Sequence, residues 1–134
     1  MIRGIGVDVS AVSRWEDDAA RDRLIRAAFH PDEAAWVKAR GAMAPQSAAG
    51  VFCAKEAFLK ALGTGIGGVK MKDIVIGHTP AGAPFYRTDG PLKAAMALIG
   101  ADSAFLSISH DGGIAAAFCV LSREEEEHAQ IPDR

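Results

Sequence analysis

The sequence lacks most features that mark exported, membrane-spanning or nucleic-acid-binding proteins. It has only two cysteines in 134 residues, and we expect both to be buried free thiols in a reducing compartment. No apolar run approaches the roughly 20 residues needed to cross a bilayer. The opening segment, MIRGIGVDVS, places an acid where a signal peptide would be continuously apolar. We therefore predict a cytoplasmic protein that does not enter a membrane.

The chain also lacks a surplus of basic residues. Its formal net charge of −2 argues against nucleic-acid binding, which usually requires a basic surface. Arginines crowd one early segment, whereas residues 124–127 are all glutamate. Such an acidic run near a terminus is typical of a solvated tail. With no internal repeat and no linker, we predict one domain over residues 1–122 and a charged tail over residues 123–134.

Hydrophobic periodicity and turn residues predict an α+β domain with a largely antiparallel sheet, because strands and helices are mixed without regular βαβ alternation. The expected helices cover residues 13–29, 31–37, 45–63 and 91–99. The expected strands cover residues 5–9, 73–76, 84–87, 104–109 and 114–121. Residues 110–113, with two glycines, are expected to form the turn between the last two strands.

The first expected strand carries an acidic residue near its end. Ile5, Val7 and Val9 alternate with smaller or polar residues, which predicts that these three face the core. Asp8 then lies on the opposite face. It could cap the following helix, or it could be a ligand for a hard cation such as Mg²⁺.

The helix expected over residues 45–63 carries the other candidate groups. Glu56 and Lys60 share a face that is distinct from its apolar stripe. A Glu–Lys pair at this spacing is also a common way to stabilise a helix surface. Lys55 adds a second cation, and the loop GTGIGG that follows could bring backbone amides close to an anion. The loop is not a P-loop, because it follows the helix instead of preceding it.

A histidine near the end of the chain is the remaining candidate. His110 follows Ser109 and precedes Asp111, where it could be an ordinary turn residue or could bind a phosphate. A Ser-His-Asp hydrolase is a poor interpretation, since adjacent residues of an extended segment point apart. The sequence also has no G-x-S-x-G motif.

Taken together, four segments resemble the holo-[acyl-carrier-protein] synthases, the small 4′-phosphopantetheinyl transferases. They are GIGVDVS, FCAKEAFLKALGTGIG, GAPF and SISHD, and they occur in that order over nearly the whole chain. The resemblance implies transfer of 4′-phosphopantetheine from coenzyme A to a serine of apo acyl carrier protein. Adenosine 3′,5′-bisphosphate would be the other product.

The resemblance also implies roles for particular residues. Asp8 and Glu56 would bind Mg²⁺, and Lys60 would neutralise the phosphates. Either Glu56 or a water held by Asp8 would take the serine proton. His110 is similar to the family histidine near the nucleotide's 3′-phosphate. The loop over residues 63–67, with Gly63, Thr64 and Gly65 as the named candidates, would line the nucleotide site.

Members of this family typically assemble as trimers with sites between subunits. We therefore expect a homotrimer in which His110 of one subunit faces Asp8 and Glu56 of its neighbour. Acyl carrier proteins are acidic, so Arg14 and Arg21 are candidates for docking them; the alternative is that these arginines only cover a solvated helix face.

One position departs from the family pattern. Many relatives carry arginine immediately before the phenylalanine of the middle motif, where this chain has Val51. If that arginine normally contacts phosphate or a partner, another cation must replace it, and Lys55 and Lys70 are available. The departure also leaves room for two rival functions, a non-catalytic coenzyme A-binding module and a structural protein. Which carrier protein would be served is not encoded in any motif.

Overall fold

The computed structural model describes residues 1–63 and 69–125. Its strands are β1 (Ile2–Ala11), β2 (Ile76–His78), β3 (Pro84–Tyr86), β4 (Ser103–Asp111) and β5 (Ile114–Ser122). Its helices are α1 (Asp18–Ala28), α2 (Pro31–Ala39), α3 (Ala44–Leu62) and α4 (Pro91–Leu98), and its short 3₁₀ turns are η1 (Val12–Trp15), η2 (Gly41–Met43) and η3 (Met71–Asp73). The predicted α+β class is confirmed.

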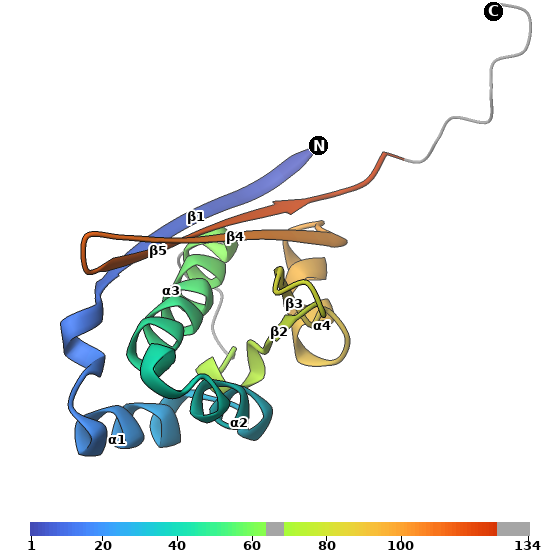
Figure 1. The fold of residues 1–134 in the computed structure, drawn as a ribbon. Coiled ribbons are helices and arrows are strands. Elements are labelled where there is room, and N and C mark those ends of the chain that lie inside the picture. Colours follow the sequence, from blue (N-terminus) through green and yellow to red (C-terminus); the bar gives the residue numbers. More distant parts are fainter. Residues whose placement is uncertain (64–68, 126–134) are drawn as a thin grey trace, which may run out of the picture.

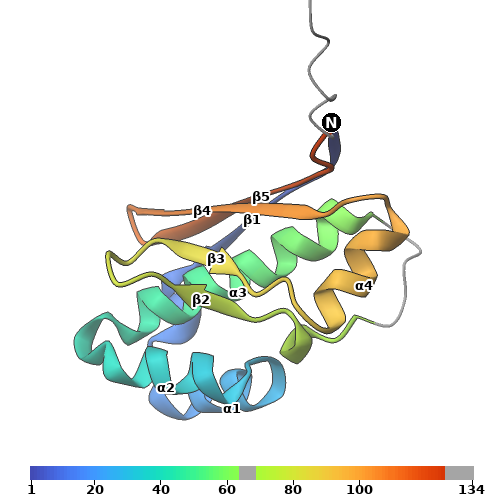
Figure 2. The ribbon, with the colours of Figure 1, turned by 90° about the vertical axis from the view of Figure 1, so that its right-hand side faces the viewer.

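The elements form layers around the long helix α3. A three-stranded antiparallel sheet in the order β1-β5-β4 covers one side of α3. Helices α1 and α2 lie on the other side, as Figures 1 and 2 show. The hairpin β2–β3 forms a second, two-stranded sheet, which lies beside α3 near α4 (Figure 2). In the described residues, no helix is long and apolar enough to cross a membrane.

The prediction of which face of β1 is buried was wrong. Ile5, Val7 and Val9 are 58%, 52% and 64% exposed. The opposite face packs on α3, because Gly4 and Gly6 let the helix approach the strand closely. A Cβ built on Gly6 would lie 1.9 Å from the carbonyl oxygen of Ala57, so only glycine fits there. Asp8 is on the face opposite the three apolar residues, as predicted.

The helix expected over residues 13–29 is interrupted. Val12–Trp15 forms the 3₁₀ turn η1, and α1 begins only at Asp18. The reason is a local cap: the Asp17 carboxylate accepts a hydrogen bond from the backbone N–H of Ala20 at 2.9 Å. The break lets the Trp15 side chain become fully buried.

The remaining elements agree more closely with the sequence. Helices α2, α3 and α4 lie where they were expected, and the predicted stripe of Val51, Phe58 and Leu62 is buried. The hairpin is shorter than predicted, because Asp73 belongs to η3 and β2 starts at Ile76. Strand β4 runs to Asp111.

Candidate functional site

Asp8 and Lys60 meet where β1 crosses the C-terminal half of α3. The Lys60 ammonium group lies 3.0 Å from Asp8 Oδ1 and also donates to the Val7 carbonyl oxygen at 3.1 Å. The Asp8 side chain is 17% exposed and that of Lys60 is 54% exposed. Asp8 is not a helix cap, since Ala11 and Asp17 occupy the N-cap positions of η1 and α1. Its carboxylate is half-buried and paired with a cation.

Glu56 lies in the same cluster, which is evident from the charges that act on Cys53, a nearby residue of α3. Burial, then Asp8 and then Glu56, together raise the pKa of the Cys53 thiol to about 12, and Lys60 opposes them. All three charges therefore lie within electrostatic range of this one sulfur. The thiol is fully buried, as predicted, and at neutral pH it is protonated. Within the described residues, Lys60 pairs with Asp8 and not with Glu56.

The donor set at this cluster suits a hard divalent cation. Asp8 and Glu56 supply two carboxylates, and Mg²⁺ is usually bound through one or two carboxylates together with substrate phosphates and water. Among residues 1–63 and 69–125, no group of three His, Cys, Asp or Glu side chains could hold a metal by itself. A cation here would therefore rely on oxygen atoms of a bound substrate to complete its coordination.

The end of α3 is only partly described. Gly63 follows the helix with a φ of +87° and donates its backbone N–H to the Lys60 carbonyl oxygen. This conformation is one that glycine adopts without strain. Thr64 and Gly65, the other loop residues predicted to bind the nucleotide, lie outside the described residues.

Lys55 does not belong to the cluster, although the sequence suggested it as a second cation. Its side chain is fully buried, is paired at 2.5 Å with the equally buried Glu33, and donates to the carbonyl oxygens of Met71 and Ile74. Adjacent helix positions point about 100° apart, so Lys55 faces away from Glu56. It cannot replace an arginine at Val51, and only Lys70, which is exposed, remains of the two substitutes proposed above.

His110 lies on the other outer strand of the sheet from Asp8. It lies within β4, opposite Ala115 of β5, and not in the turn. Its Nε2 atom is 3.1 Å from the Gln46 carbonyl oxygen and packs over Gly50, whose added Cβ would lie 2.9 Å from Nε2. Strands β1 and β4 are the two outer strands of the sheet, with β5 between them. One subunit therefore brings Asp8, Glu56 and Lys60 together but leaves His110 apart.

Beside His110 is a cavity that the sequence did not reveal. It has a volume of about 440 Å³ and is lined from α2, α3, the β2–β3 hairpin and β4. Trp36 and Arg40 from the region of α2 and His78 from β2 face it. These three residues are far apart in sequence and form no recognisable motif. Only their three-dimensional arrangement could identify them.

The two arginines predicted to dock a partner differ in their surroundings. Arg14 is exposed, and its guanidinium lies over the rings of Trp15 and Phe52. The Arg21 side chain is only 15% exposed and is bonded to Asp18 at 2.8 Å and to the Trp15 carbonyl oxygen at 2.9 Å. Arg14 is thus the more accessible of the two.

Comparisons with known proteins show the family to which the chain is similar. The family model of the 4′-phosphopantetheinyl transferase superfamily matches residues 4–119. A holo-[acyl-carrier-protein] synthase of Treponema denticola is 37% identical, over 90% of this chain and 98% of its own length. The crystal structure of the Neisseria meningitidis synthase superposes with a TM-score of 0.78 at 31% identity, covering 92% of this chain and all of that one (100%). The Bacillus anthracis synthase, solved in complex with CoA (3′,5′-ADP), gives 0.75 at 32% identity, covering 92% and 99%.

Proposed function

This chain belongs to the 4′-phosphopantetheinyl transferase superfamily, and we propose that it is a holo-[acyl-carrier-protein] synthase. It transfers the 4′-phosphopantetheine group of coenzyme A to a serine hydroxyl of apo acyl carrier protein. The single observation that carries this proposal is the contact between Asp8 and Lys60, beside Glu56, in a chain similar along nearly its full length to synthases of this kind. We place the reaction in the cytoplasm.

The reaction transfers a phosphoryl group between two oxygens. The serine oxygen attacks the phosphorus that carries pantetheine, and the bond from that phosphorus to the bridging oxygen of the pyrophosphate breaks. Adenosine 3′,5′-bisphosphate leaves with the bridging oxygen, and the serine proton passes to a base. Negative charge grows on oxygens throughout, so cations and hydrogen-bond donors supply most of the catalysis.

Each group of the cluster has a role in that chemistry. Lys60 is held by Asp8 and still has its side chain 54% exposed, so its ammonium group is available to a phosphate. Glu56, or a water held by Asp8, takes the serine proton. We assign Asp8 and Glu56 as the residues that would hold Mg²⁺; when bound, the ion neutralises charge on the pyrophosphate.

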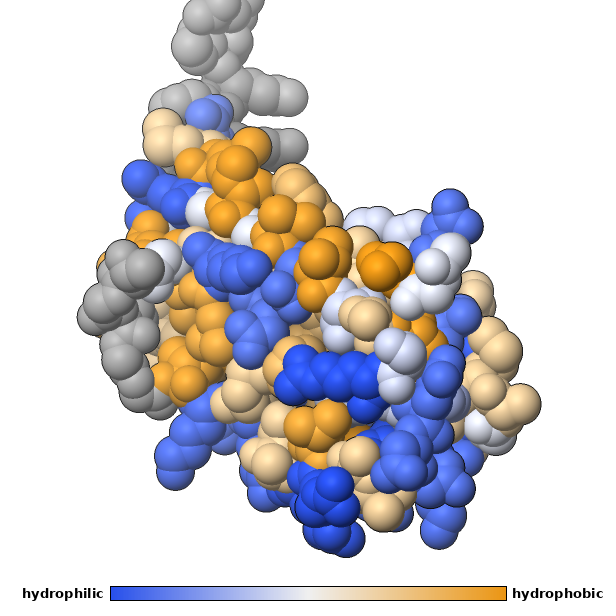
Figure 3. All heavy atoms as spheres, turned by 90° about the vertical axis from the view of Figure 1, so that its left-hand side faces the viewer, coloured by the Kyte–Doolittle hydropathy of each residue, from blue (hydrophilic) through white to orange (hydrophobic). Residues whose placement is uncertain are grey.

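We further propose that the enzyme is a homotrimer. The sheet face away from α3 exposes large apolar side chains from all three strands, and a face of this kind on a single subunit marks an interaction surface. Part of this surface is visible in the upper half of Figure 3. Its members are Ile5, Val7, Val9, Phe105, Ile114 and Phe118, with exposures between 45% and 64%.

A trimer also offers a way to complete the site. His110 and Asp8 lie on opposite outer strands of one sheet, with β5 between them. If the apolar faces meet around a threefold axis, the β4 edge of one subunit comes next to the β1 edge of another. His110 of one subunit then binds the nucleotide whose pyrophosphate lies at Asp8 and Glu56 of its neighbour, as the sequence suggested.

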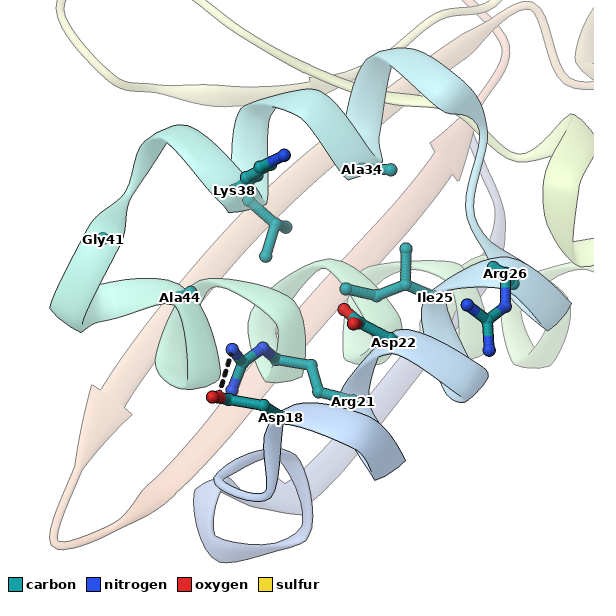
Figure 4. A pocket seen from close by; sticks show the side chains of 10 residues that line it. Asp18, Arg21, Asp22, Ile25, Arg26, Ala34, Lys38, Gly41 and Ala44 are labelled. Atoms are coloured by element: carbon teal, nitrogen blue, oxygen red, sulfur yellow. Dashed lines mark hydrogen bonds and ion pairs between the residues drawn. The ribbon is translucent and has the colours of Figure 1, made fainter.

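The carrier protein would dock beside the exposed end of β1. Arg14 is the leading candidate, because it is exposed and lies close to Asp8 in sequence. Arg21 contributes less directly. Figure 4 shows it on α1 paired with Asp18, at a hollow between α1 and α2 that Asp22 and Lys38 also line. The mixture of acidic and basic groups in this hollow does not favour an acidic partner as clearly as Arg14 does.

A transfer assay tests the proposed function. The chain is incubated with coenzyme A, Mg²⁺ and a panel of apo acyl carrier proteins from fatty-acid and secondary-metabolic systems, and each carrier is weighed by mass spectrometry. We expect one carrier class to gain the mass of one phosphopantetheine arm. Unmodified carriers across the panel, with coenzyme A binding seen by calorimetry, would instead identify a non-catalytic binding module. Unmodified carriers with no such binding would support a structural role.

A further inference from the structure

The hairpin β2–β3 is held differently at its base and at its tip. At the base, the backbone N–H of Ile76 donates to the buried Glu33 carboxylate at 2.9 Å, and the Tyr86 hydroxyl donates to the Ala54 carbonyl oxygen at 2.6 Å. At the tip, residues 79–83 form a turn whose hydrogen bonds, within the described part of the chain, all join one residue of the turn to another. The base is therefore tied to α2 and α3 by buried polar contacts, whereas the tip is not.

A pair of stacked rings joins the last residue of β2 to α2. The rings of His78 and Trp36 lie parallel, with their centroids 3.7 Å apart and their planes 5° from coplanar. The rings of His30 and His110 form hydrogen bonds with backbone groups, but in residues 1–63 and 69–125 the His78 ring forms none and has no ion pair. The attachment of the tip to α2 therefore depends on how well these two rings stack.

The surroundings of His78 keep its ring uncharged. Burial, and then the nearby Arg40, lower the pKa of His78 from its ordinary value of 6.5, so the ring is neutral at physiological pH. The Arg40 guanidinium also lies over the Trp36 ring, 5.3 Å from its centroid. The other titratable group that lines the same cavity is His110, and no aspartate or glutamate lines it. A proton on His78 would therefore have a cation nearby and no carboxylate to offset it.

Protonation of His78 has two opposing effects on the stack. A cation on an indole face is attracted by roughly 0.5–2 kcal/mol. Against this, a charged imidazole loses hydration in the stack, and it shares the indole with the Arg40 guanidinium. Because the pKa of His78 is lowered, the unfavourable effects are the larger. A ring released into water would keep an ordinary pKa, so the stack is fully stable above pH 6.5 and weakens as pH falls through the lowered pKa.

We infer that the Trp36–His78 stack is a pH-sensitive latch, which holds the tip of the hairpin against α2 and releases it when the medium becomes mildly acidic. The buried contacts at the base of the hairpin involve neither ring, so the release is local and the fold persists. The tip also forms one wall of the cavity beside His110, so the latch determines how far that cavity is closed. The wall residues of the tip are Thr79, Pro80 and Gly82.

Tryptophan fluorescence of the free chain, recorded from about pH 8 to about pH 5, tests the latch without any ligand. The emission of Trp36 is obtained as the difference between the unmodified chain and Trp36→Phe, which keeps the buried Trp15. We expect its maximum to move to longer wavelength in one transition with a midpoint below 6.5, because the released indole gains water. His78→Phe keeps an aromatic ring that cannot take a proton and should abolish the transition. His30→Asn, which can still cap α2, should retain it.

A second variant changes neither ring. Arg40→Gln removes the neighbouring cation, so the midpoint should move upwards towards 6.5. Arg123→Gln, a matched change outside the cavity, should leave the midpoint where it is. Hydrogen exchange measures the release directly: the protection of amides in residues 77–83, compared with that of amides in α3, should fall through the same transition.

Three results would overturn the latch. They are a Trp36 emission that does not change with pH, a transition that survives in His78→Phe, and a midpoint that Arg40→Gln does not move. Circular dichroism of each protein across the same pH range separates local release from unfolding. A loss of helix signal through the transition would also overturn the latch, since the fold would then be unfolding as a whole.

Discussion

Lys55 and Glu33 form an ion pair in the protein core, with both side chains completely buried. Every charged side-chain atom of the pair is hydrogen-bonded. The Lys55 ammonium group also donates to the Met71 and Ile74 carbonyl oxygens, and the Glu33 carboxylate accepts the backbone N–H groups of His30 and Ile76. The pair therefore ties α2 and α3 to the segment between η3 and β2. The lysine of the FCAKEAF motif supports the site by organising the fold.

Removing one member of this pair should destabilise the protein severely. Lys55→Met leaves the Glu33 carboxylate buried without its partner, and we expect the free energy of unfolding to fall by about 3–5 kcal/mol. Urea unfolding followed by circular dichroism measures the loss. Arg87→Gln, which removes the exposed pair with Asp32, is the control and should cost less than about 1 kcal/mol. A stable Lys55→Met variant with a raised KM for coenzyme A would contradict this role and return Lys55 to the phosphate site.

The two carboxylates of the cluster should be needed for turnover and not for folding. We expect Asp8→Asn and Glu56→Gln each to lower kcat by about 100-fold or more, and to raise the Mg²⁺ concentration required for half-maximal rate. The transfer assay with titrated Mg²⁺ checks both effects. Asp102→Asn changes an exposed carboxylate outside the cluster and should leave the rate intact. Either cluster variant keeping a third of the activity at ordinary Mg²⁺ would rule out the metal assignment.

A charge placed on the exposed sheet face should separate the subunits. Val7→Glu puts a carboxylate in the middle of that face, where burial against another subunit would be costly. Light scattering after size-exclusion chromatography should give three times the chain mass of 14.1 kDa for the unmodified chain and one chain mass for the variant. Leu98→Glu alters an apolar residue that is 73% exposed on α4 and should remain trimeric. A monomeric unmodified chain would refute the trimer.

Alkaline pH should weaken the fold through Cys53. Its pKa is about 12 in the folded chain against an ordinary value of 9.0, so the folded state keeps its proton where the unfolded state has lost it. The stabilising contribution is complete below pH 9 and is lost as pH rises from 9 towards 12. At pH 10.5 the loss is about 2 kcal/mol.

The urea concentration at the midpoint of unfolding, determined at several pH values between 8 and 10.5, measures this loss of stability. Cys53→Ala should unfold with a shallower pH dependence than the unmodified chain, because it lacks the titrating thiol. Some dependence should persist, since burial also raises the pKa of Cys119, to about 11. Identical pH profiles for the two proteins would show that Cys53 titrates equally in both states.

Sequence reasoning succeeded where the signal was local. It placed α2, α3, α4 and the last hairpin, because caps, glycines and periodicity lie within each segment. The resemblance identified Asp8, Glu56 and Lys60 as a group, and the structure brings them together. It could not show that Lys55 is buried, because its partner Glu33 lies on another helix. The alternating pattern assigned the wrong face of β1 to the core. Gly4 and Gly6 allow α3 to pack closely on the strand, but in the sequence they only appear as residues with low strand propensity.

The cavity around Arg40 shows the same limit. Its lining comes from α2, α3, the hairpin and β4, and no spacing in the sequence relates these segments. The sequence indicated only that another cation must replace the family arginine at Val51 if that arginine normally contacts phosphate or a partner.

The length of α3 has a consequence for how coenzyme A is shared between chains. Gly50, beside His110, and Lys60, beside Asp8, are separated along the helix axis by about 15 Å at a rise of about 1.5 Å per residue. In the proposed trimer, we expect His110 and Glu56 to act on one donor molecule from different subunits. Trimers assembled from Glu56→Gln chains and His110→Gln chains would then contain some junctions with both wild-type residues. Such mixtures should recover a kcat/KM for coenzyme A that neither parent shows, because complementary defects cancel where a site is shared between chains.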